Sequence, residues 1–447
     1  MPPSRRAEQR SRSTVPISRR TARRAVATAA ALAVVLPLSA CGGGSGGGGA
    51  ADASGRIEGS ITFQTWNLQA NFKPYFTGVI AEFEKKYPGT DVKWIDQPAE
   101  GYADKLSADA AGGTLPDVVN VSPDLLAPLA KAGLALDLDQ AAAKYRKEYL
   151  PGAWAGHGIP GMEGTYAFPW YLNTGPLFYN KRLFREAGLD AEKPPTTYDE
   201  LFAQSLRIAG KSKGRIATLA NIPTIEDFGR YGVRLMNDEG TAFTFNDAKG
   251  VELLTKYKEL YDAKALDPQA LTATPESAGK KFLTQAVAMN PGSALDLEKF
   301  RKDAPALYGD IGITEQISST GKDNMYVMGV MVNARTERTP AAVAFAHFVT
   351  DARHQMEFAK QVAIFPSTAG SLDDPYFTKE DGTDATRVRI AAAKSLKTAV
   401  NYTPVLMSDQ MKTELRNAVA RALQGKESPK EALDNAVKAC DRLLKQS

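Results

Sequence analysis

The chain has 447 residues, enough for about two or three domains, and its 43% hydrophobic and 24% charged residues are typical of soluble globular proteins. The formal net charge of +4 comes from the first 40 residues, which hold eight arginines and one acid. The remaining residues hold 47 basic and 50 acidic side chains, and this balance argues against a nucleic-acid partner.

The first 40 residues have the order of parts found in a secretory signal. A basic stretch ends at Arg24, and an apolar stretch follows from Ala25 to Ala40. A membrane-spanning helix needs about 20 apolar residues, so this shorter run favours a signal peptide. The arginine pairs in "SRRTARR" (18–24) leave the choice between the Sec and twin-arginine export routes open.

A cysteine stands directly after this apolar stretch. Leu38 to Cys41 read "LSAC", and seven glycines and one serine follow at 42–49. The motif resembles the lipobox of bacterial lipoproteins, which implies acyl chains such as palmitate on Cys41. It predicts a signal peptide at 1–40, a lipidated cysteine with a Gly/Ser tether at 41–56, and an anchor on the outer face of the cell membrane. An ordinary signal peptide with an incidental cysteine is the alternative.

Cys440 is the only other cysteine, so acylation of Cys41 would exclude a disulfide within the chain. It stands on the apolar stripe of a predicted helix in "ALDNAVKACDRLL", where we expect a small buried hydrophobic side chain. The exported fold must then be held together by its hydrophobic core.

The ordered chain is expected to begin near Arg56 with alternating strands and helices. Apolar runs and alternation predict strands, and spacing of three to four residues predicts helices. The predicted strands are 60–66, 90–96 and 116–122, and the helices are 76–89, 101–113 and 123–138. This order is the βαβ rhythm of a parallel sheet.

Further strands and helices follow along the chain. Residues 166–174 are predicted to be extended, because Pro169 blocks a helix. Thr197 and Glu200 form a predicted capping box for a helix that starts near Tyr198. The other predicted strands are 175–180, 286–289 and 326–334, and the other helices are 181–189, 246–265, 339–350 and, with a break at 425–429, 409–444.

Four stretches carry a family resemblance. They are "ITFQTWN" (61–67), "GGTLPDVVNVSPDLLAPLAKAGLALDL" (112–138), "YAFPWYLNTGPLFYNKRLFREAGLDAEKPPTTYDEL" (166–201) and "AVAMNPGSALDL" (286–297). In this order, behind a lipobox, they resemble the extracellular solute-binding proteins of ABC importers, in the carbohydrate-binding group that includes the maltose-binding protein. The resemblance covers about residues 57 to 447 of the chain.

This resemblance implies an α/β, two-lobed periplasmic-binding-protein-like fold (type II), in which a ligand cleft lies between lobes joined by crossing strands. We expect the lobes to close around the ligand by hinge motion. The division that follows from the resemblance puts lobe one at 57–168 and 290–335 and lobe two at 169–289 and 336–447.

A sugar-binding cleft needs aromatic faces for the C–H surfaces and polar groups for the hydroxyls. Trp66 ends the first strand, where parallel sheets present ligand groups, and Trp170 lies in the first predicted crossing. We expect both to line the cleft, with packing in the hinge or core as the alternative. Asn67 follows Trp66 in a loop, where its amide would bind hydroxyls or contribute only ordinary loop polarity.

Polar candidates follow the later strands. Asp124, with Ser122 close by, begins a helix near the point where the family often has a ligand-binding acid; a purely structural N-cap is the alternative. Asn173 stands in the first crossing, where the family places a polar ligand group. Glu226 and Asp227 are expected where the second lobe faces the cleft, with solvated acids as the alternative.

The second predicted crossing contains Gly292 and Ser293, where a glycine lets the backbone approach a ligand closely. The family commonly has tryptophan near here, and this chain has "GSAL" instead, a departure that weakens the case for a long stacked oligosaccharide. Tyr326 and Phe365 are further candidate ligand contacts.

We therefore expect an exported, monomeric receptor that binds a mono- or oligosaccharide and delivers it to ABC permease subunits. No metal-ligand or catalytic motif stands out, so no cofactor, metal or enzymatic activity is expected. The alternatives are a receptor for another solute, such as a polyamine, a peptide or a metal chelate, and a secreted glycan-degrading enzyme, which would need two carboxylates across one cleft.

Overall fold

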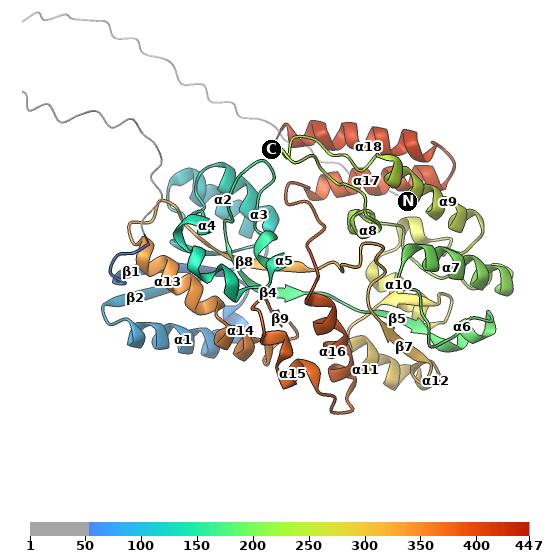
Figure 1. The fold of residues 1–447 in the computed structure, drawn as a ribbon, viewed down its shortest axis with the longest axis horizontal. Helices are drawn as coiled ribbons and strands as arrows, with labels where there is room; N and C mark the ends of the chain where they lie inside the picture. The colour runs from blue at the N-terminus through green and yellow to red at the C-terminus, as the bar shows by residue number, and fades with distance from the viewer. Residues whose placement is uncertain (1–52, 447) are drawn as a thin grey trace, which may run out of the picture. The chain divides into compact units, whose positions relative to one another are not determined.

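A six-stranded mixed sheet organises one part of the fold (Figure 1). Its strands, in spatial order, are β2 (Thr90–Gln97), β1 (Gly59–Trp66), β3 (Val118–Val121), β8 (Tyr326–Val332), β4 (Phe168–Asn173) and β9 (Phe365–Pro366). β1 runs parallel to β2 and β3, while β8 is antiparallel to β3 and β4. The parallel βαβ start of the chain that the sequence predicts is therefore confirmed.

The computed structural model describes residues 53–446. The predicted signal peptide at 1–40, the predicted lipidation of Cys41 and the tether up to residue 52 lie outside this range. Among the described residues, no helix has both the length and the apolar character needed to cross a bilayer.

Helices cover both faces of this sheet because its strands are apolar on both sides. In β3, Val118 points into one hydrophobic cluster and Val119 into another, as alternation along a strand requires. The first cluster includes α1 (Gln69–Lys86), α13 (Thr339–Thr350) and α14 (Ala352–Ala359). The second includes α2 (Tyr102–Gly112) and α3 (Pro123–Lys131). Two short helices, α4 (Leu138–Ala141) and α5 (Pro151–Ala155), follow α3.

A three-stranded antiparallel sheet organises the other part, in the order β6 (Met289–Pro291), β5 (Leu177–Asn180) and β7 (Ile311–Thr314). Its largest hydrophobic cluster is built with helices. They are α6 (Lys181–Glu186), α7 (Tyr198–Ser212), α8 (Ile225–Tyr231), α9 (Ala248–Asp262), α17 (Asp409–Leu423) and α18 (Pro429–Leu444). The capping box of Thr197 and Glu200 is present, and Cys440 is fully buried in α18, as predicted.

A smaller set of helices surrounds β6 and β7 or links the two sheets. They are α10 (Pro275–Leu283), α11 (Ala294–Asp303), α12 (Pro305–Tyr308), α15 (Pro375–Thr378) and α16 (Asp384–Leu396). Val388 of α16 packs in the cluster around Phe178 of β5, whereas Ala392 packs in a cluster with Leu172 of β4. The helix α16 therefore contacts both sheets, and Figure 1 shows it beside the strands that run between them.

We call the six-stranded sheet with its helices lobe one, and the three-stranded sheet with its helices lobe two. The chain crosses between them three times, at 174–176, 315–325 and 397–408. The predicted division of the chain is wrong in several places. Residues 169–173 and 365–366 belong to lobe one, because β4 pairs with β8 and β9 in the six-stranded sheet. Residues 290–314 stay in lobe two, because β6 pairs with β5 and α11 leads back to β7. Residues 339–359 stay in lobe one, because α13 and α14 pack on β1 and β4.

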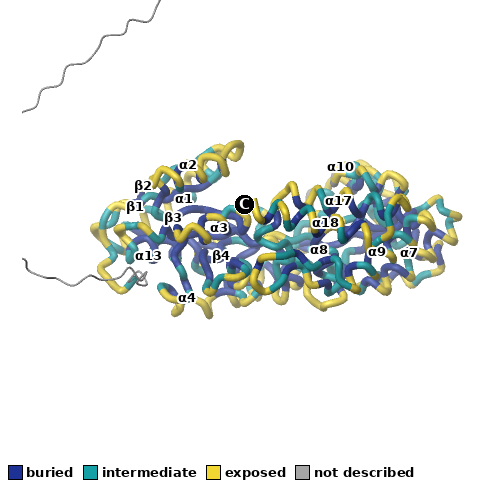
Figure 2. The backbone as a smooth tube through the Cα atoms, turned by 90° about the horizontal axis from the view of Figure 1, so that it is seen from above, coloured by how far each residue is buried: buried dark blue, intermediate teal, exposed yellow. Residues whose placement is uncertain are grey.

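Side chains and backbone groups also join the lobes directly. Leu406 in the third crossing packs against hydrophobic residues of both lobes. The backbone N–H of Gly161 in lobe one donates to the carbonyl of Asp238 in lobe two at 3.1 Å. Figure 2 shows buried backbone segments in both lobes, with exposed segments on the outside.

Candidate functional site

One edge of the six-stranded sheet collects most of the predicted ligand groups. β1 and β3 are parallel, so their carboxyl ends, at Trp66 and Ser122, reach the same edge. β8 is antiparallel to β3, so it begins there, at Tyr326, and β4 ends there with Asn173 paired to Tyr326. The first crossing leaves this carboxyl edge and the second reaches it, so the edge faces the connections to lobe two.

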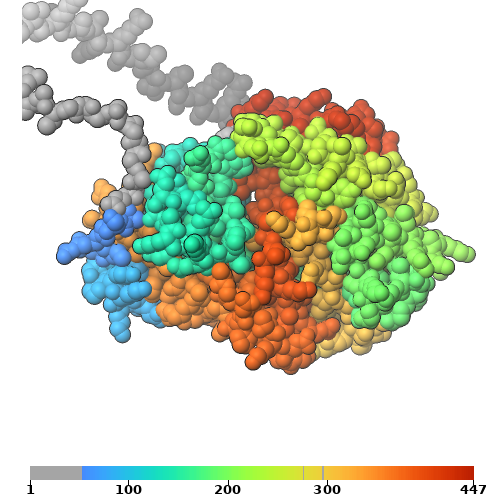
Figure 3. All heavy atoms as spheres, viewed as in Figure 1, coloured from blue at the N-terminus to red at the C-terminus, as the bar shows by residue number. Residues whose placement is uncertain are grey.

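A cavity of about 760 Å³ lies at the β4–β9 end of this carboxyl edge. Both lobes line it: lobe one through the start of β8 and the loop after α14, and lobe two through the turn after β6 and the start of α11. Predicted ligand residues on its wall are Asn173, Gly292, Ser293, Tyr326 and Phe365. In Figure 3 the red-orange atoms of the α16 region, which borders the cavity, lie between the teal atoms of lobe one and the green atoms of lobe two.

Tyr326 joins this cavity to the rest of the carboxyl edge. Tyr326 is 42% exposed, and in the described chain only Leu206, at 40%, is another large hydrophobic residue in the exposed class. Partial burial raises its pKa, the carboxylates of Asp124 and Asp409 raise it further, and a hydrogen bond with the Ser122 hydroxyl lowers it. Asp409 begins α17 in lobe two, so Tyr326 stands where groups of both lobes meet.

Several polar side chains along this edge have no hydrogen-bond partner among residues 53–446. They are the amides of Asn67 and Asn173 and the carboxylate of Asp124, and all three residues are exposed. Asn67 holds a left-handed backbone with φ of +53°, which turns the chain away from β1. Asp124 lies in the first turn of α3, and Ser122 takes the N-cap position instead. These groups are free to bind an external molecule.

Trp66 is half-buried and packs edge-on against Tyr102, with ring centroids 4.7 Å apart. This contact fixes the indole at the end of β1 while part of it stays exposed. Trp66 therefore keeps the position that we predicted for a cleft aromatic, on the carboxyl edge.

Trp170 does not line the cleft, and that prediction is wrong. Its side chain is fully buried, with Phe63, Phe76 and Phe358 around it at centroid distances of 5.8 to 6.5 Å. Phe168 lies in the same cluster, so alternation along β4 points both rings into lobe one. The packing alternative holds, and the indole cannot stack on a ligand.

Asp227 has a structural role in place of the predicted ligand contact. Its carboxylate accepts hydrogen bonds from Tyr198 and Thr224 and pairs with Arg230 at 2.6 Å, which uses both oxygens. Glu226 accepts from the hydroxyl of Thr403 in the third crossing at 2.5 Å. Only Glu226 of this pair therefore has a carboxylate oxygen without a partner in the described chain.

Three predicted ligand residues on the cavity wall, Gly292, Ser293 and Phe365, also have structural roles. A Cβ on Gly292 would lie 2.1 Å from the ring of Phe178, so the glycine allows the backbone to pass over that ring. Ser293 caps α11 and donates to Asp296 at 2.6 Å. Phe365 is 7% exposed and belongs to the hydrophobic cluster beside the cavity.

Several residues that line the cavity were not predicted from the sequence. Gln316 and Asn324 come from the second crossing, Lys360 follows α14, and Tyr376 and Arg389 come from α15 and α16. No local motif marks them, since they reach the cavity only because the second crossing and the segment from α14 to α16 lie beside the boundary between the lobes.

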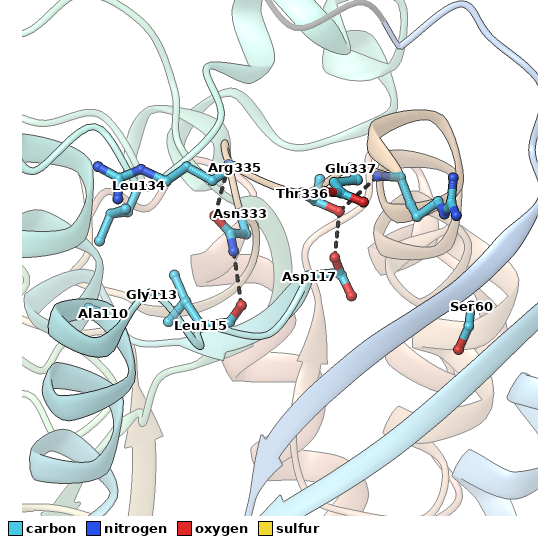
Figure 4. A pocket seen from close by; sticks show the side chains of 11 residues that line it. Ser60, Ala110, Gly113, Leu115, Asp117, Leu134, Asn333, Arg335, Thr336 and Glu337 are labelled. Carbon is cyan, nitrogen blue, oxygen red and sulfur yellow. Dashed lines mark hydrogen bonds between the residues drawn. The ribbon is translucent and has the colours of Figure 1, made fainter. Parts of the chain in front are cut away.

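A second pocket, of about 360 Å³, lies at the opposite, amino edge of the same sheet (Figure 4). Asp117 accepts hydrogen bonds from the backbone and hydroxyl of Thr62 and from the hydroxyl of Thr336. Asn333 donates to the Leu115 carbonyl and accepts from the Arg335 N–H, as Figure 4 shows. These polar groups bind one another, so this pocket is the weaker candidate.

The titratable groups of the described chain offer no metal site, since no three His, Cys, Asp or Glu side chains gather there. His157 is fully buried, and this burial lowers its pKa to about 4, which keeps it neutral near pH 7. The groups at the carboxyl edge and its cavity include an exposed phenol, amides, a carboxylate and the cations of Lys360 and Arg389, which suit non-covalent binding.

The sequence of this chain is similar to those of known binding proteins. Residues 69–356 match the sequence model of the family described as bacterial extracellular solute-binding protein. Among curated relatives, the sn-glycerol-3-phosphate-binding periplasmic protein UgpB of Salmonella typhimurium is 26% identical over 308 residues, 62% of this chain and 67% of the relative.

Solved structures share the fold. The sugar-binding protein MalE of Xanthomonas citri matches with a TM-score of 0.70 and 19% identity, over 87% of this chain and 98% of that one. The GacH receptor of Streptomyces glaucescens, solved unliganded and with acarbose, matches with a TM-score of 0.60 and 24% identity, over 87% and 99%. The α/β, type II two-lobed fold expected from the sequence is confirmed.

Proposed function

The chain belongs to the bacterial extracellular solute-binding proteins of ABC importers, and we propose that its own solute is a sugar, held between the lobes at the carboxyl edge of the six-stranded sheet. Sugar-binding neighbours of the same fold support this choice. The proposal includes no bond cleavage: the receptor binds, closes and presents its solute to a membrane permease.

The observation that carries the proposal is the exposed ring of Tyr326 among free polar groups. A phenol face suits the C–H surface of a sugar ring, and the amides of Asn67 and Asn173 and the carboxylate of Asp124 suit its hydroxyls. A buried hydroxyl without a partner costs about 1–3 kcal/mol, so such groups supply specificity.

The three crossings join the lobes, and we propose that the lobes close around the solute. A ligand shifts the open–closed equilibrium only by its differential affinity for the two arrangements. Tyr326 from lobe one and Asp409 from lobe two already interact electrostatically, so a sugar between them would gain contacts from both lobes on closure. We propose that this gain drives closure and permease recognition.

Export and anchoring belong to the same proposal. The family is extracellular, and we propose that the receptor is a monomer tethered to the outer face of the membrane by acyl chains on Cys41. Mass spectrometry of protein purified from membranes tests the anchor: the Cys41→Ala chain is expected to lack the acyl mass and to leave the membrane fraction.

A thermal-shift screen of mono- and oligosaccharides, followed by calorimetry, tests the solute class. A ligand that binds only the native state stabilises it by RT ln(1 + [L]/Kd), about 2.7 kcal/mol at a hundredfold excess over Kd. We expect a sugar to raise Tm and to be recovered unchanged. A response only to polyamines, peptides or metal chelates would overturn the sugar proposal, and release of sugar products would indicate an enzyme.

A further inference from the structure

Two cationic side chains line the cavity between the lobes, and neither has an ion pair among residues 53–446. Arg389 projects from α16, and Lys360 follows α14. The only carboxylate on the cavity wall is that of Asp296. Its Oδ2 accepts from both the backbone N–H and the hydroxyl of Ser293 in the capping box of α11. The wall therefore holds two cations and one carboxylate, and that carboxylate forms an ion pair with neither cation.

Arg389 is held in one orientation before any ligand arrives. Its Nε donates to the carbonyl of Tyr376 at 2.6 Å, and its Nη2 donates to the hydroxyl of Thr386 at 3.0 Å. The guanidinium carbon lies 3.8 Å from the centroid of the Tyr376 ring. Nη1 has no hydrogen-bond partner in the described chain. A fixed, half-buried guanidinium loses little side-chain entropy on binding, and its planar fork matches carboxylate and phosphate oxygens.

One further carboxylate acts on Arg389 from outside the cavity. The charge of Asp381 interacts with Arg389, but the Asp381 carboxylate accepts from the backbone and hydroxyl of Thr383. Asp381 is exposed, so solvent screens its effect. It does not fill the hydrogen-bonding positions that Nη1 leaves open.

The other end of the carboxyl edge has the opposite charge. Asp124 and Asp409 act on Tyr326, which also lines the cavity. Asp124 and Asp409 lie beyond the cavity wall, so a solute in the cavity meets cations near α16 and the Tyr326 phenol toward the two carboxylates. This polarity suits a molecule with hydroxyls at one end and an anionic group at the other.

We propose that Arg389 and Lys360 bind a phosphate or carboxylate substituent of the solute, so that the receptor selects acidic sugar derivatives over neutral ones. This inference rests on the proposed sugar-binding function and adds the class of sugar. The anionic group lies at the α16 end of the cavity, and the hydroxyls lie toward Tyr326 and Asn173.

Calorimetry with the full chain and matched solutes tests the selection. The neutral probes are glucose and glycerol, and the acidic probes are glucose 6-phosphate, glucuronate and sn-glycerol 3-phosphate. We expect at least one acidic probe to bind tenfold or more tightly than its neutral parent. Inorganic phosphate at millimolar concentration is expected to compete with it.

Variants locate the anion site. Arg389→Gln and Lys360→Gln are each expected to weaken the acidic probe tenfold or more and to leave a neutral sugar within twofold. Lys360 is exposed, so its variant does not disturb the fold even if Arg389→Gln does. Arg387→Gln is the matched control: it lies on the same helix and pairs with Asp384, outside the cavity wall.

The possible failures separate the two proposals. Neutral sugars that bind as well as their acidic derivatives, or an acidic probe unaffected by Lys360→Gln and Arg389→Gln, overturn the acidic-sugar inference alone. The absence of binding to any sugar, neutral or acidic, overturns the proposed function and this inference with it.

Discussion

The two edges of the six-stranded sheet use similar residues for opposite purposes. At the amino edge, Asp117 accepts three hydrogen bonds from Thr62 and Thr336, and Asn333 is bonded on both sides of its amide. At the carboxyl edge, Asn67, Asn173 and Asp124 have no hydrogen-bond partner in the described chain. A pocket exists at each edge, so a hollow alone does not identify the site.

The difference between the edges separates polar groups that stabilise the fold from polar groups that are available to a ligand. A half-buried polar group bonded within the protein contributes to stability, because its loss leaves partners unsatisfied. A polar group left open at a lobe boundary contributes nothing to folding and is available to a ligand. We therefore expect substitutions at the amino edge to change stability alone and those at the carboxyl edge to change affinity alone.

The largest expected effect is at the amino edge. Asp117→Ala removes a carboxylate that joins β1 to the loop after β8, and we expect it to lower the free energy of unfolding by about 2–4 kcal/mol. Urea unfolding measures this loss, and ligand affinity should not change. Asp91→Ala is the control, because Asp91 accepts only the exposed hydroxyl of Ser60 and pairs weakly with Lys93. An equal loss in both variants would contradict the structural role of Asp117.

His157, which is buried beside Gly329 of β8, should make stability depend on pH. Burial depresses the pKa of His157 from 6.5 to about 4, so the unfolded state binds this proton more readily than the folded state. The stability that neutral His157 contributes is present above pH 6.5 and is lost as pH falls toward 4, by about 3 kcal/mol in total. Unfolding curves of the wild type and His157→Gln, measured at several pH values, should differ in slope across this window. Parallel pH profiles for the wild type and His157→Gln would refute the expected contribution of His157.

Tyr326 tests the carboxyl edge. Truncation to alanine removes the exposed ring, and we expect ligand affinity to fall at least tenfold, about 1.4 kcal/mol, with a change in Tm of less than about 2 °C. Leu206→Ala is the matched control, since Leu206 is 40% exposed and lies on α7, away from the site. A drop in Tm with unchanged affinity would place Tyr326 with the structural residues instead.

Asn173 should give the smallest effect, again on affinity only. Its amide has no partner in the described chain, so Asn173→Ala removes at most one or two ligand hydrogen bonds, about 1 kcal/mol, or roughly fivefold in Kd. Asn333→Ala is the comparison at the amino edge and should lower Tm without changing Kd. If Asn173→Ala lowers Tm as much as Asn333→Ala, the contrast between the edges does not hold.

Much of the fold could be predicted from local patterns. The strands around Phe63 and Val119, the helices after them, and the capping box at Thr197 all follow from spacing within ten residues or so. The position of the candidate ligand groups at the ends of β1 and β3 followed too, because parallel strands share a carboxyl edge. The sequence therefore allowed Trp66, Asn67 and Asp124 to be placed at this edge.

The burial of Trp170 could not be predicted from the sequence. A tryptophan in an extended segment near a crossing predicts either a cleft or a core residue, and the sequence gives no sign of which face is covered. Trp170 is a core residue because α1 and α14 bring Phe76 and Phe358 against its indole ring. Phe358 lies 188 positions along the chain, so no local pattern contains this contact.

The sequence by itself determined the alternating elements and the family, because these depend on residues close together in the chain. Only the tertiary structure decided that α13 and α14 return to lobe one and that Arg389 reaches the cavity beside Tyr376. The physical reason is that strand pairing and helix packing join distant segments: β8 pairs with β3 and β4 across 150 residues or more, so its place sets both edges of the sheet.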